Sequence, residues 1–211
     1  MFWTILEKST QHLFISFSSL LIAICIALPL GFTLSRKKNQ KMTLLIIRAI
    51  SLIQTMPGLA MIAVIVVILA SMRNFISIPT TGFLPGVLAL SLYGISPILT
   101  NTYTGITQVS PAMIDVATGL GMTKRQILFQ VQAPHAIPMI IAGIRIAGAW
   151  TIGMCTLASL VGSGGLGDLI LQGLRSMNAT LVLAGTIPAA CLAALFELGM
   201  SILEKWLTVR K

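Results

Sequence analysis

Five long apolar stretches, separated by short polar segments, limit what this chain of 211 residues can fold into. A helix of about 20 mostly apolar residues crosses the hydrocarbon core of a bilayer. Only 9% of the residues are charged, whereas a soluble domain has about a quarter. The pattern predicts an all-α membrane protein, a single domain over 1–211, with about five transmembrane helices. The expected spans are 13–34, 43–70, 83–105, 137–160 and 181–203.

The first two stretches are both expected to stay in the membrane. The first differs from a cleavable signal peptide, because its flank carries Glu7 and only Lys8, its apolar core is too long, and its basic cluster follows the core. The second is long enough for a tilted or broken helix, and Pro57 and Gly58 lie in its middle.

Positive residues are concentrated in alternate connections between the stretches. Lys and Arg stay on the cytoplasmic side of membrane proteins, so the first connection, the third connection and the carboxyl-terminal tail are expected inside. This topology, and not nucleic-acid binding, accounts for the net charge of +9. The sequence thus predicts the amino terminus outside and the carboxyl terminus inside. The residues behind this prediction are Arg36, Lys37, Lys38, Lys41, Lys124, Arg125, Lys205, Arg210 and Lys211.

Reactive side chains are scattered along the chain. Cys25, Cys155 and Cys191 lie inside apolar stretches without metal-ligand spacing. His12 and His135 are far apart and are expected on opposite sides of the membrane. A membrane-embedded enzyme would need a cluster of His, Asp, Glu or Cys at one depth. We therefore expect no catalytic residue, no metal site and no cofactor bound by this chain.

The longest polar stretch, 110–138, begins with signals for a short helix. Ser110 followed by Pro111 is typical of a helix start. Asp115 follows in the first turns, where a negative charge suits the helix dipole. Gly121 then permits a turn, so this helix is expected to end before it.

A second short helix is expected directly after the turn. Thr123 can cap a helix that runs from Lys124 towards Val131. Pro134 and Pro138 are expected to end it before the fourth span begins. The sequence therefore predicts two short helices joined by a glycine turn at the cytoplasmic face of the membrane.

The residue spacing in this segment resembles the EAA loop of ATP-binding cassette importer permeases. In that family the loop forms a coupling helix that docks into a groove on the cytoplasmic ATPase subunit. Three positions depart from the family pattern, since Asp115 replaces Glu, Val116 replaces the first Ala and Ala133 replaces Leu. The alternative is an amphipathic connector that rests on the membrane surface. The resemblance implies ATPase coupling for Asp115, Val116, Ala117, Gly121, Met122, Thr123, Val131 and Pro134.

Three further segments, 54–64, 84–106 and 141–170, resemble the permeases for the osmoprotectant quaternary amines glycine betaine, carnitine and choline. The resemblance implies the type I importer (MetI-like) membrane fold and a multi-pass permease subunit in a bacterial inner membrane. The implied partners are cytoplasmic ABC ATPase subunits that bind ATP and Mg, a second identical or paralogous permease, an extracytoplasmic substrate-binding protein and membrane lipid. Nucleic acid is not expected as a partner.

The broken second stretch supplies candidates for the lining of a translocation path. A proline inside a span frees backbone groups, which a cavity or neighbouring helices can satisfy. This favours Gln54, Met56 and Pro57, with simple helix packing as the equal alternative. Asn101 and Trp150 are weaker candidates. Trp150 could attract a quaternary ammonium group by a cation–π interaction, although aromatic residues in membrane bundles more often pack.

Arg145 lies one or two turns into the fourth span. A charge inside a span is expensive and by default indicates function, so a place in the translocation path, in gating or in coupling is one interpretation. The other is structural, because arginine near a helix end can snorkel to the headgroups or form an internal ion pair.

The glycine-rich stretch 161–168 is superficially similar to a phosphate-binding loop. It lacks the lysine of a nucleotide P-loop, and the predicted topology places it outside the cell. We therefore expect tight turns and close backbone packing at the external mouth and no nucleotide site.

Other transport functions remain open at this point. The same architecture could serve an amino acid, methionine, an anion or a betaine-like histidine derivative. A secondary transporter usually shows an internal repeat and intramembrane acids. No repeat is visible in this sequence, and Glu197 is the only acid well inside a span, which counts against that class.

Overall fold

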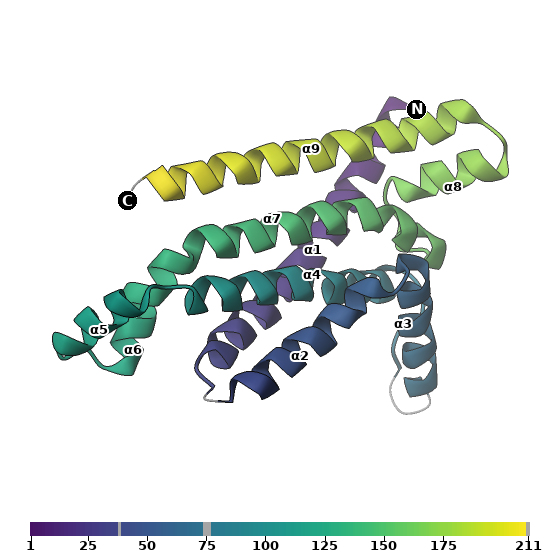
Figure 1. Ribbon diagram of the computed structural model, residues 1–211. Helices are drawn as coiled ribbons and strands as arrows, with labels where there is room; N and C mark the ends of the chain where they lie inside the picture. Colours follow the sequence, from purple (N-terminus) through teal and green to yellow (C-terminus); the bar gives the residue numbers. More distant parts are fainter. Residues whose placement is uncertain (38, 74–76, 210–211) are drawn as a thin grey trace.

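The computed structural model describes residues 1–37, 39–73 and 77–209, and within these ranges it is helical with no strand. Helices α4, α7 and α9 run side by side, α1 crosses behind them, and α5 and α6 lie at one end (Figure 1). In chain order the elements are α1 (Phe2–Ser35), α2 (Gln40–Leu52), η1 (Ile53–Thr55), α3 (Gly58–Met72), α4 (Phe83–Thr107), α5 (Pro111–Gly119), α6 (Lys124–Gln126), η2 (Ile127–Gln132), α7 (Ala133–Ala158), η3 (Ser159–Val161), α8 (Gly167–Arg175) and α9 (Ala179–Val209).

Four helices of the described chain are long and apolar enough to cross a membrane, and α2 with α3 makes a fifth candidate that is bent by 105°. The break falls where the sequence predicted it. Met56 is extended, with φ −71° and ψ 137°, because a residue that precedes a proline is driven out of the helical region. The chain becomes helical again at Gly58, where α3 begins in a new direction.

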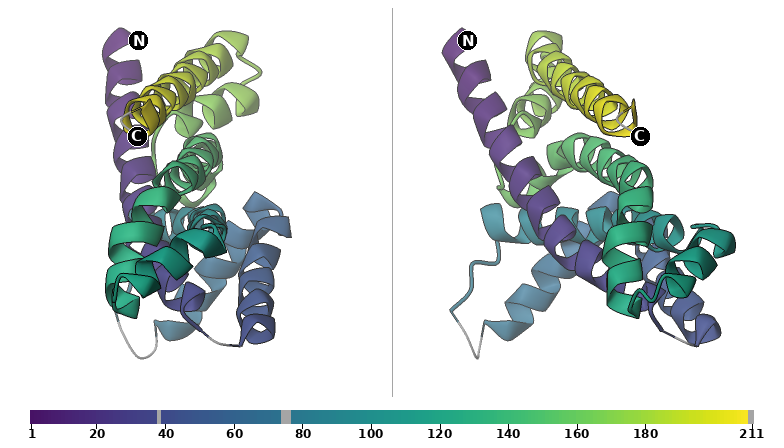
Figure 2. Two further views of the ribbon diagram at one scale, coloured as in Figure 1. Left: turned by 60° about the vertical axis from the view of Figure 1, so that its left-hand side comes forward. Right: turned by 90° about the vertical axis from the view of Figure 1, so that its left-hand side faces the viewer.

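Helix α4 forms the centre of the bundle and packs against both α1 and α7 (Figure 2). In its most apolar 18-residue window 72% of the residues are buried. Small residues allow this close packing. A Cβ atom at Gly94 would lie 2.9 Å from that of Ala23 on α1. One at Gly143 on α7 would lie 2.8 Å from the Cβ of Asn101 and 2.9 Å from the carbonyl oxygen of Pro97.

The prediction that Pro134 and Pro138 end the second short helix is wrong. Residues Lys124–Val161 form one continuous helix of 38 residues. Pro134 falls in the first turn of α7, directly after the π-helical turn η2. The wider π turn changes the hydrogen-bond register there, which removes the need for the N–H that proline lacks. Pro138 lies inside α7, where neighbouring helices make such a proline tolerable.

The glycine-rich turn after α7 forms a tight junction with the start of α4. Gly162, Gly164 and Gly165 have φ values of 78°, 87° and 87°, a region that glycine enters without steric cost. The backbone N–H of Gly82 donates to the carbonyl oxygen of Val161 at 2.7 Å. The tight turns expected from the sequence are therefore present.

Helix α8 follows this turn and was not anticipated, since its nine residues lie in a segment interpreted as a connection. Lys8 of α1 forms an ion pair with Asp168 at 2.6 Å. The side-chain oxygen of Gln11 accepts hydrogen bonds from Lys8 and from the backbone N–H of Gly165, each at 3.3 Å. These contacts hold the amino-terminal part of α1 against the turn and α8.

Candidate functional site

The coupling segment, residues 110–135, lies at one end of the bundle, where α5 and α6 extend beyond the other helices (Figure 1). Ser110 and Pro111 begin α5 as predicted, with proline at the first helical position. Asp115 lies in the second turn, and the first turn holds no acid. The expected benefit of Asp115 to the helix dipole is therefore small, because that effect is confined to the first turn.

The turn between α5 and α6 has the chemistry that the sequence predicted. Gly121 has a φ of 77°, and the N–H of Met122 donates to the carbonyl oxygen of Ala117 at 3.1 Å. Thr123 then caps α6 in a capping box with Gln126. The Thr123 N–H donates to Gln126 Oε1 at 2.8 Å, and the Gln126 N–H donates to Thr123 Oγ1 at 3.4 Å. The turn holds α5 at a fixed angle to the long helix.

An apolar groove runs along α5, and no other element of the described chain fills it. Val116 is 64% exposed and Leu120 is 78% exposed. Asp115 is also exposed, does not line the groove, and forms no ion pair within the described ranges. Such an apolar patch on a surface segment is typical of a docking site for a partner. The lining residues are Ala112, Met113, Val116, Ala117, Leu120, Met122 and Val131.

The coupling segment is fixed to the membrane helices by buried contacts. Leu128 is 3% exposed and packs with Ile106 at the end of α4. The Gln132 side-chain amide donates to the carbonyl oxygen of Ile106 at 3.4 Å. The rings of Phe32 and Phe129 stack with centroids 6.1 Å apart. Movement of the segment is therefore tied to the ends of α1 and α4.

The structure brings the predicted coupling residues into one region but gives them different positions. Val116, Ala117, Met122 and Val131 line the groove, Gly121 and Thr123 shape the turn, Asp115 lies outside the groove, and Pro134 lies in the long helix. Sequence reasoning missed Leu120, whose spacing of four residues from Val116 was the available signal.

Gln54, Met56 and Pro57 meet at the bend between α2 and α3, where Tyr93 of α4 holds them. Pro97 lacks the N–H that would bond to the Tyr93 carbonyl oxygen in a regular helix. The Gln54 side-chain amide donates to that oxygen instead, at 3.4 Å. The Tyr93 hydroxyl in turn donates to the carbonyl oxygen of Met56. One contact thus supplies a donor to the carbonyl oxygen that Pro97 leaves free and to the Met56 carbonyl oxygen at the break before Pro57. Sequence reasoning had not included Tyr93.

Replacing Tyr93 by Phe tests this contact. We expect Tyr93→Phe to lower the free energy of unfolding by about 0.5–1.5 kcal/mol, because the part-buried hydrogen bond from the Tyr93 hydroxyl to the Met56 carbonyl oxygen is lost. Unfolding by dodecyl sulfate in mixed micelles, followed by circular dichroism, measures the loss. Tyr103→Phe is the control, since the Tyr103 hydroxyl forms no hydrogen bond within the described ranges. Equal losses in both variants would contradict the assignment.

Asn101 and Trp150 do not join the residues at the bend. The Asn101 side chain donates to the carbonyl oxygen of Pro97 in its own helix at 2.8 Å, which is a local structural role. Trp150 is 51% exposed on α7, where it is available to lipid or to another subunit.

Arg145 forms an internal ion pair, which was one of the two interpretations of this residue. Its Nη1 lies 2.7 Å from Glu204 Oε2, and its Nε lies 3.3 Å from Glu197 Oε1. Both acids belong to α9. Arg145 therefore faces α9 and not the bend at Met56.

Comparison with known proteins agrees with this architecture. Residues 27–209 match the family of binding-protein-dependent transport system inner membrane components. The carnitine transport permease protein OpuCB of Listeria monocytogenes is 38% identical, over 97% of this chain and 88% of its own. The glycine betaine/carnitine/choline transport system permease protein OpuCB of Bacillus subtilis is 36% identical over the same shares. A chain of the inward-facing MetNI methionine ABC transporter superposes with a TM-score of 0.85 at 19% identity, covering 98% of this chain and 97% of that one.

The chain belongs to the family of inner membrane components of binding-protein-dependent transport systems. It is a permease subunit of an ATP-binding cassette importer with a MetI-like fold, and it resides in the inner membrane.

Proposed function

We propose that this permease moves a small quaternary amine, namely glycine betaine, carnitine or choline. The names of the relatives support this, since they are called permeases for these solutes and match 97% of the chain. The three solutes share a quaternary ammonium group, which a single pathway can accept. The chain itself is not the ATPase in this proposal, because ATP and Mg are bound by the partner subunits.

The apolar groove on α5 is the observation that carries the proposed mechanism. An exposed face with Val116 and Leu120 at its centre suits insertion into a cytoplasmic ATPase subunit. Closure of two such subunits around ATP would pull the coupling segment, and the helices attached to it would switch the pathway between inward and outward access. A second permease copy or paralogue completes the pathway, and an extracytoplasmic binding protein delivers the solute.

Charge supports an orientation with the coupling segment inside the cell. Lys124 and Arg125 lie on α6, in the coupling segment. Arg36 and Lys37 follow the end of α1, and the stacked rings of Phe32 and Phe129 place these two regions side by side. Basic residues gathered at one end favour the cytoplasmic side. In this proposal the amino terminus is outside and the carboxyl terminus is inside.

The lining of the pathway is proposed at the bend of α2 and α3. Gln54, Met56 and Pro57 interrupt a span there, and irregular backbone at membrane depth survives only in protein surroundings or beside a water-filled cavity. Met56 and Pro57 are exposed in the single chain, which leaves them accessible to solute once a second permease closes the pathway.

The proposed function is tested by purifying the tagged chain in mild detergent from cells that contain its natural partners. We expect a cassette ATPase and an extracytoplasmic binding protein to co-purify, and the complex in liposomes to accumulate labelled glycine betaine, carnitine or choline only with ATP. Uptake without ATP by the chain alone would instead establish a secondary carrier. An ATP-dependent complex that takes up none of the three amines would overturn the substrate assignment alone.

A further inference from the structure

The coupling segment and Arg145 belong to one uninterrupted helix. Residues Lys124–Val161 are helical throughout, and Arg145 lies 21 residues after Lys124. At 1.5 Å per residue this places Arg145 about 30 Å along the helix from its cytoplasmic start. A movement at α6 therefore reaches Arg145 within a single helix, in which Pro134 and Pro138 donate no backbone hydrogen bond.

Arg145 is the charged link between this helix and α9. Its guanidinium group contacts Glu204 at 2.7 Å and Glu197 at 3.3 Å. The two acids are seven residues apart, which places them on one face of α9 two turns apart. The planar fork of arginine can donate to two carboxylates at once. One residue of α7 thus forms ion pairs with two residues of α9 that lie two helical turns apart.

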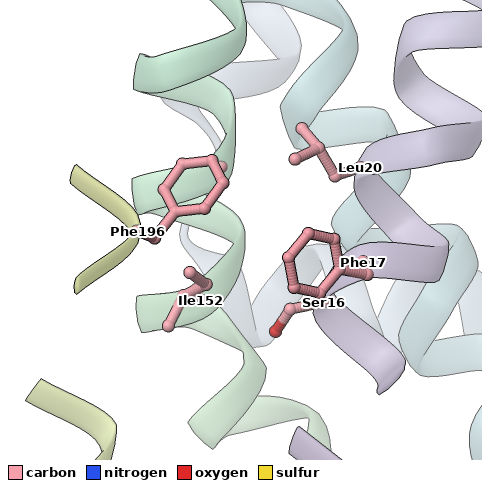
Figure 3. Close-up of a pocket in the computed structure, with 6 residues that line it drawn as sticks. Ser16, Phe17, Leu20, Ile152 and Phe196 are labelled. Atoms are coloured by element: carbon pink, nitrogen blue, oxygen red, sulfur yellow. The ribbon is translucent and has the colours of Figure 1, made fainter. Parts of the chain in front are cut away.

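The amino-terminal half of α9 packs on α8, whereas the half that carries Glu197 and Glu204 packs on α7. In its most apolar 18-residue window only 6% of the residues are buried, against 39% for the helix that contains α7. Apolar contacts of Phe196 add to the ion pairs, because its ring packs against the cluster that contains Ala147 and lies against Gly148, where a Cβ atom would overlap it. Figure 3 shows Phe196 of α9 facing Phe17 and Leu20 of α1 across a small pocket, with Ile152 of α7 on the same side as Phe196. At the level of Arg145, α9 is therefore held on α7 by the ion pairs and by Phe196.

The cost of a charge inside a membrane span favours the arrangement in which Arg145 stays next to Glu197 and Glu204. A charge within a span is costly, so each of the three charged groups is stabilised by staying with its partners. Sliding or separating α9 would move Glu197 and Glu204 away from Arg145, whose side chain is 31% exposed in the single chain. The two helices therefore prefer to move together.

We propose that Arg145 is a positioning residue that makes α9 follow the helix Lys124–Val161 during transport. This rests on the proposed ATP-driven import. Movement imposed on α6 by the ATPase reaches α9 through Arg145, Glu197 and Glu204, so that α9 changes position together with α7. Without this link the ATPase would cycle while α9 lagged behind.

The test separates coupling from simple stability by measuring two activities of the same complex. The complex with its ATPase, binding protein and second permease is reconstituted with Arg145→Gln, with Glu204→Gln, or with both. ATP hydrolysis and uptake of labelled solute are measured per assembled complex. We expect uptake per ATP to fall on the order of tenfold in each single variant, while ATP hydrolysis stays within about twofold of wild type. Because Arg145→Gln already breaks the pair with Glu204 as well as the pair with Glu197, the double variant should lose no more than Arg145→Gln alone.

The control is Lys205→Gln, which removes an exposed charge next to Glu204 without touching the pair and should leave uptake per ATP unchanged. Parallel losses of hydrolysis and uptake in the Arg145 and Glu204 variants would assign the pair a purely structural role and overturn the proposal. Unchanged uptake per ATP, or single losses that multiply in the double variant, would overturn it as well. A wild-type complex without ATP-dependent uptake would instead refute the proposed function.

Discussion

Placing two carboxylates on the apolar face of α5 should abolish ATP-driven uptake. In the variant Val116→Asp/Leu120→Asp, both new charges lie where the groove is most exposed, so they would be buried by a docked ATPase. Each substitution removes an anchor worth roughly 2 kcal/mol or more, which together weakens ATPase binding on the order of a thousandfold. Co-purification of the ATPase with the tagged permease, and uptake into liposomes, measure the loss.

The chain itself should remain folded in this variant, because Val116 and Leu120 contribute little buried surface. Thr118→Asp is the matched control, since it adds a charge to an exposed position of the same helix that does not line the groove. We expect it to retain the ATPase. Retention of the ATPase by the double variant would refute α5 as the docking helix, and loss in Thr118→Asp would show a general sensitivity of α5 to charge.

A leucine at Gly143 should strongly destabilise the bundle. A Cβ atom at this position would lie 2.8 Å from Asn101 Cβ, 2.9 Å from the Pro97 carbonyl oxygen and 3.2 Å from Ile98 Cα. Two of these atoms belong to the backbone of α4 and cannot turn aside. Helices α4 and α7 must therefore separate, at a cost of about 3 kcal/mol or more in the free energy of unfolding. Unfolding in mixed micelles and the yield of monodisperse protein measure it.

Gly153→Leu provides the comparison, because it makes the same change on the same helix at a site with no atom within 4 Å of the added Cβ. We expect near wild-type stability for Gly153→Leu. Similar behaviour of the two variants would mean that leucine itself, and not the contact between α4 and α7, is responsible. This pair of variants probes the centre of the bundle, whereas the α5 variants probe its surface.

The positions of the membrane helices could be predicted from the sequence because hydropathy is a local property. The third span was expected at 83–105, and α4 is Phe83–Thr107. The break at Pro57 was also predictable, since proline restricts its own neighbour. The angle of 105° was not, because Tyr93 and Gln54, 39 residues apart, make the contact that holds the bend.

The same distinction applies to the coupling segment. The start of α5 and the Thr123 cap depend on a few neighbouring residues and were predicted. The continuity of the helix through Pro134 was not predicted. The π turn that permits it is held in place by contacts of Leu128 and Gln132 with the end of α4. The partners of Arg145 were also beyond sequence reasoning, since Glu197 and Glu204 are 52 and 59 residues away along the chain.

The buried histidine of α1, His12, has a consequence for biosynthesis. His12 is fully buried, and its ring nitrogen Nε2 lies 3.0 Å from the carbonyl oxygen of Ile152. These residues are 140 positions apart, so at about 5–20 residues per second the ribosome needs roughly 7–30 seconds to supply the partner. During that interval the His12 imidazole lacks this carbonyl partner. Stable accommodation of the first helix therefore waits for the arrival of α7.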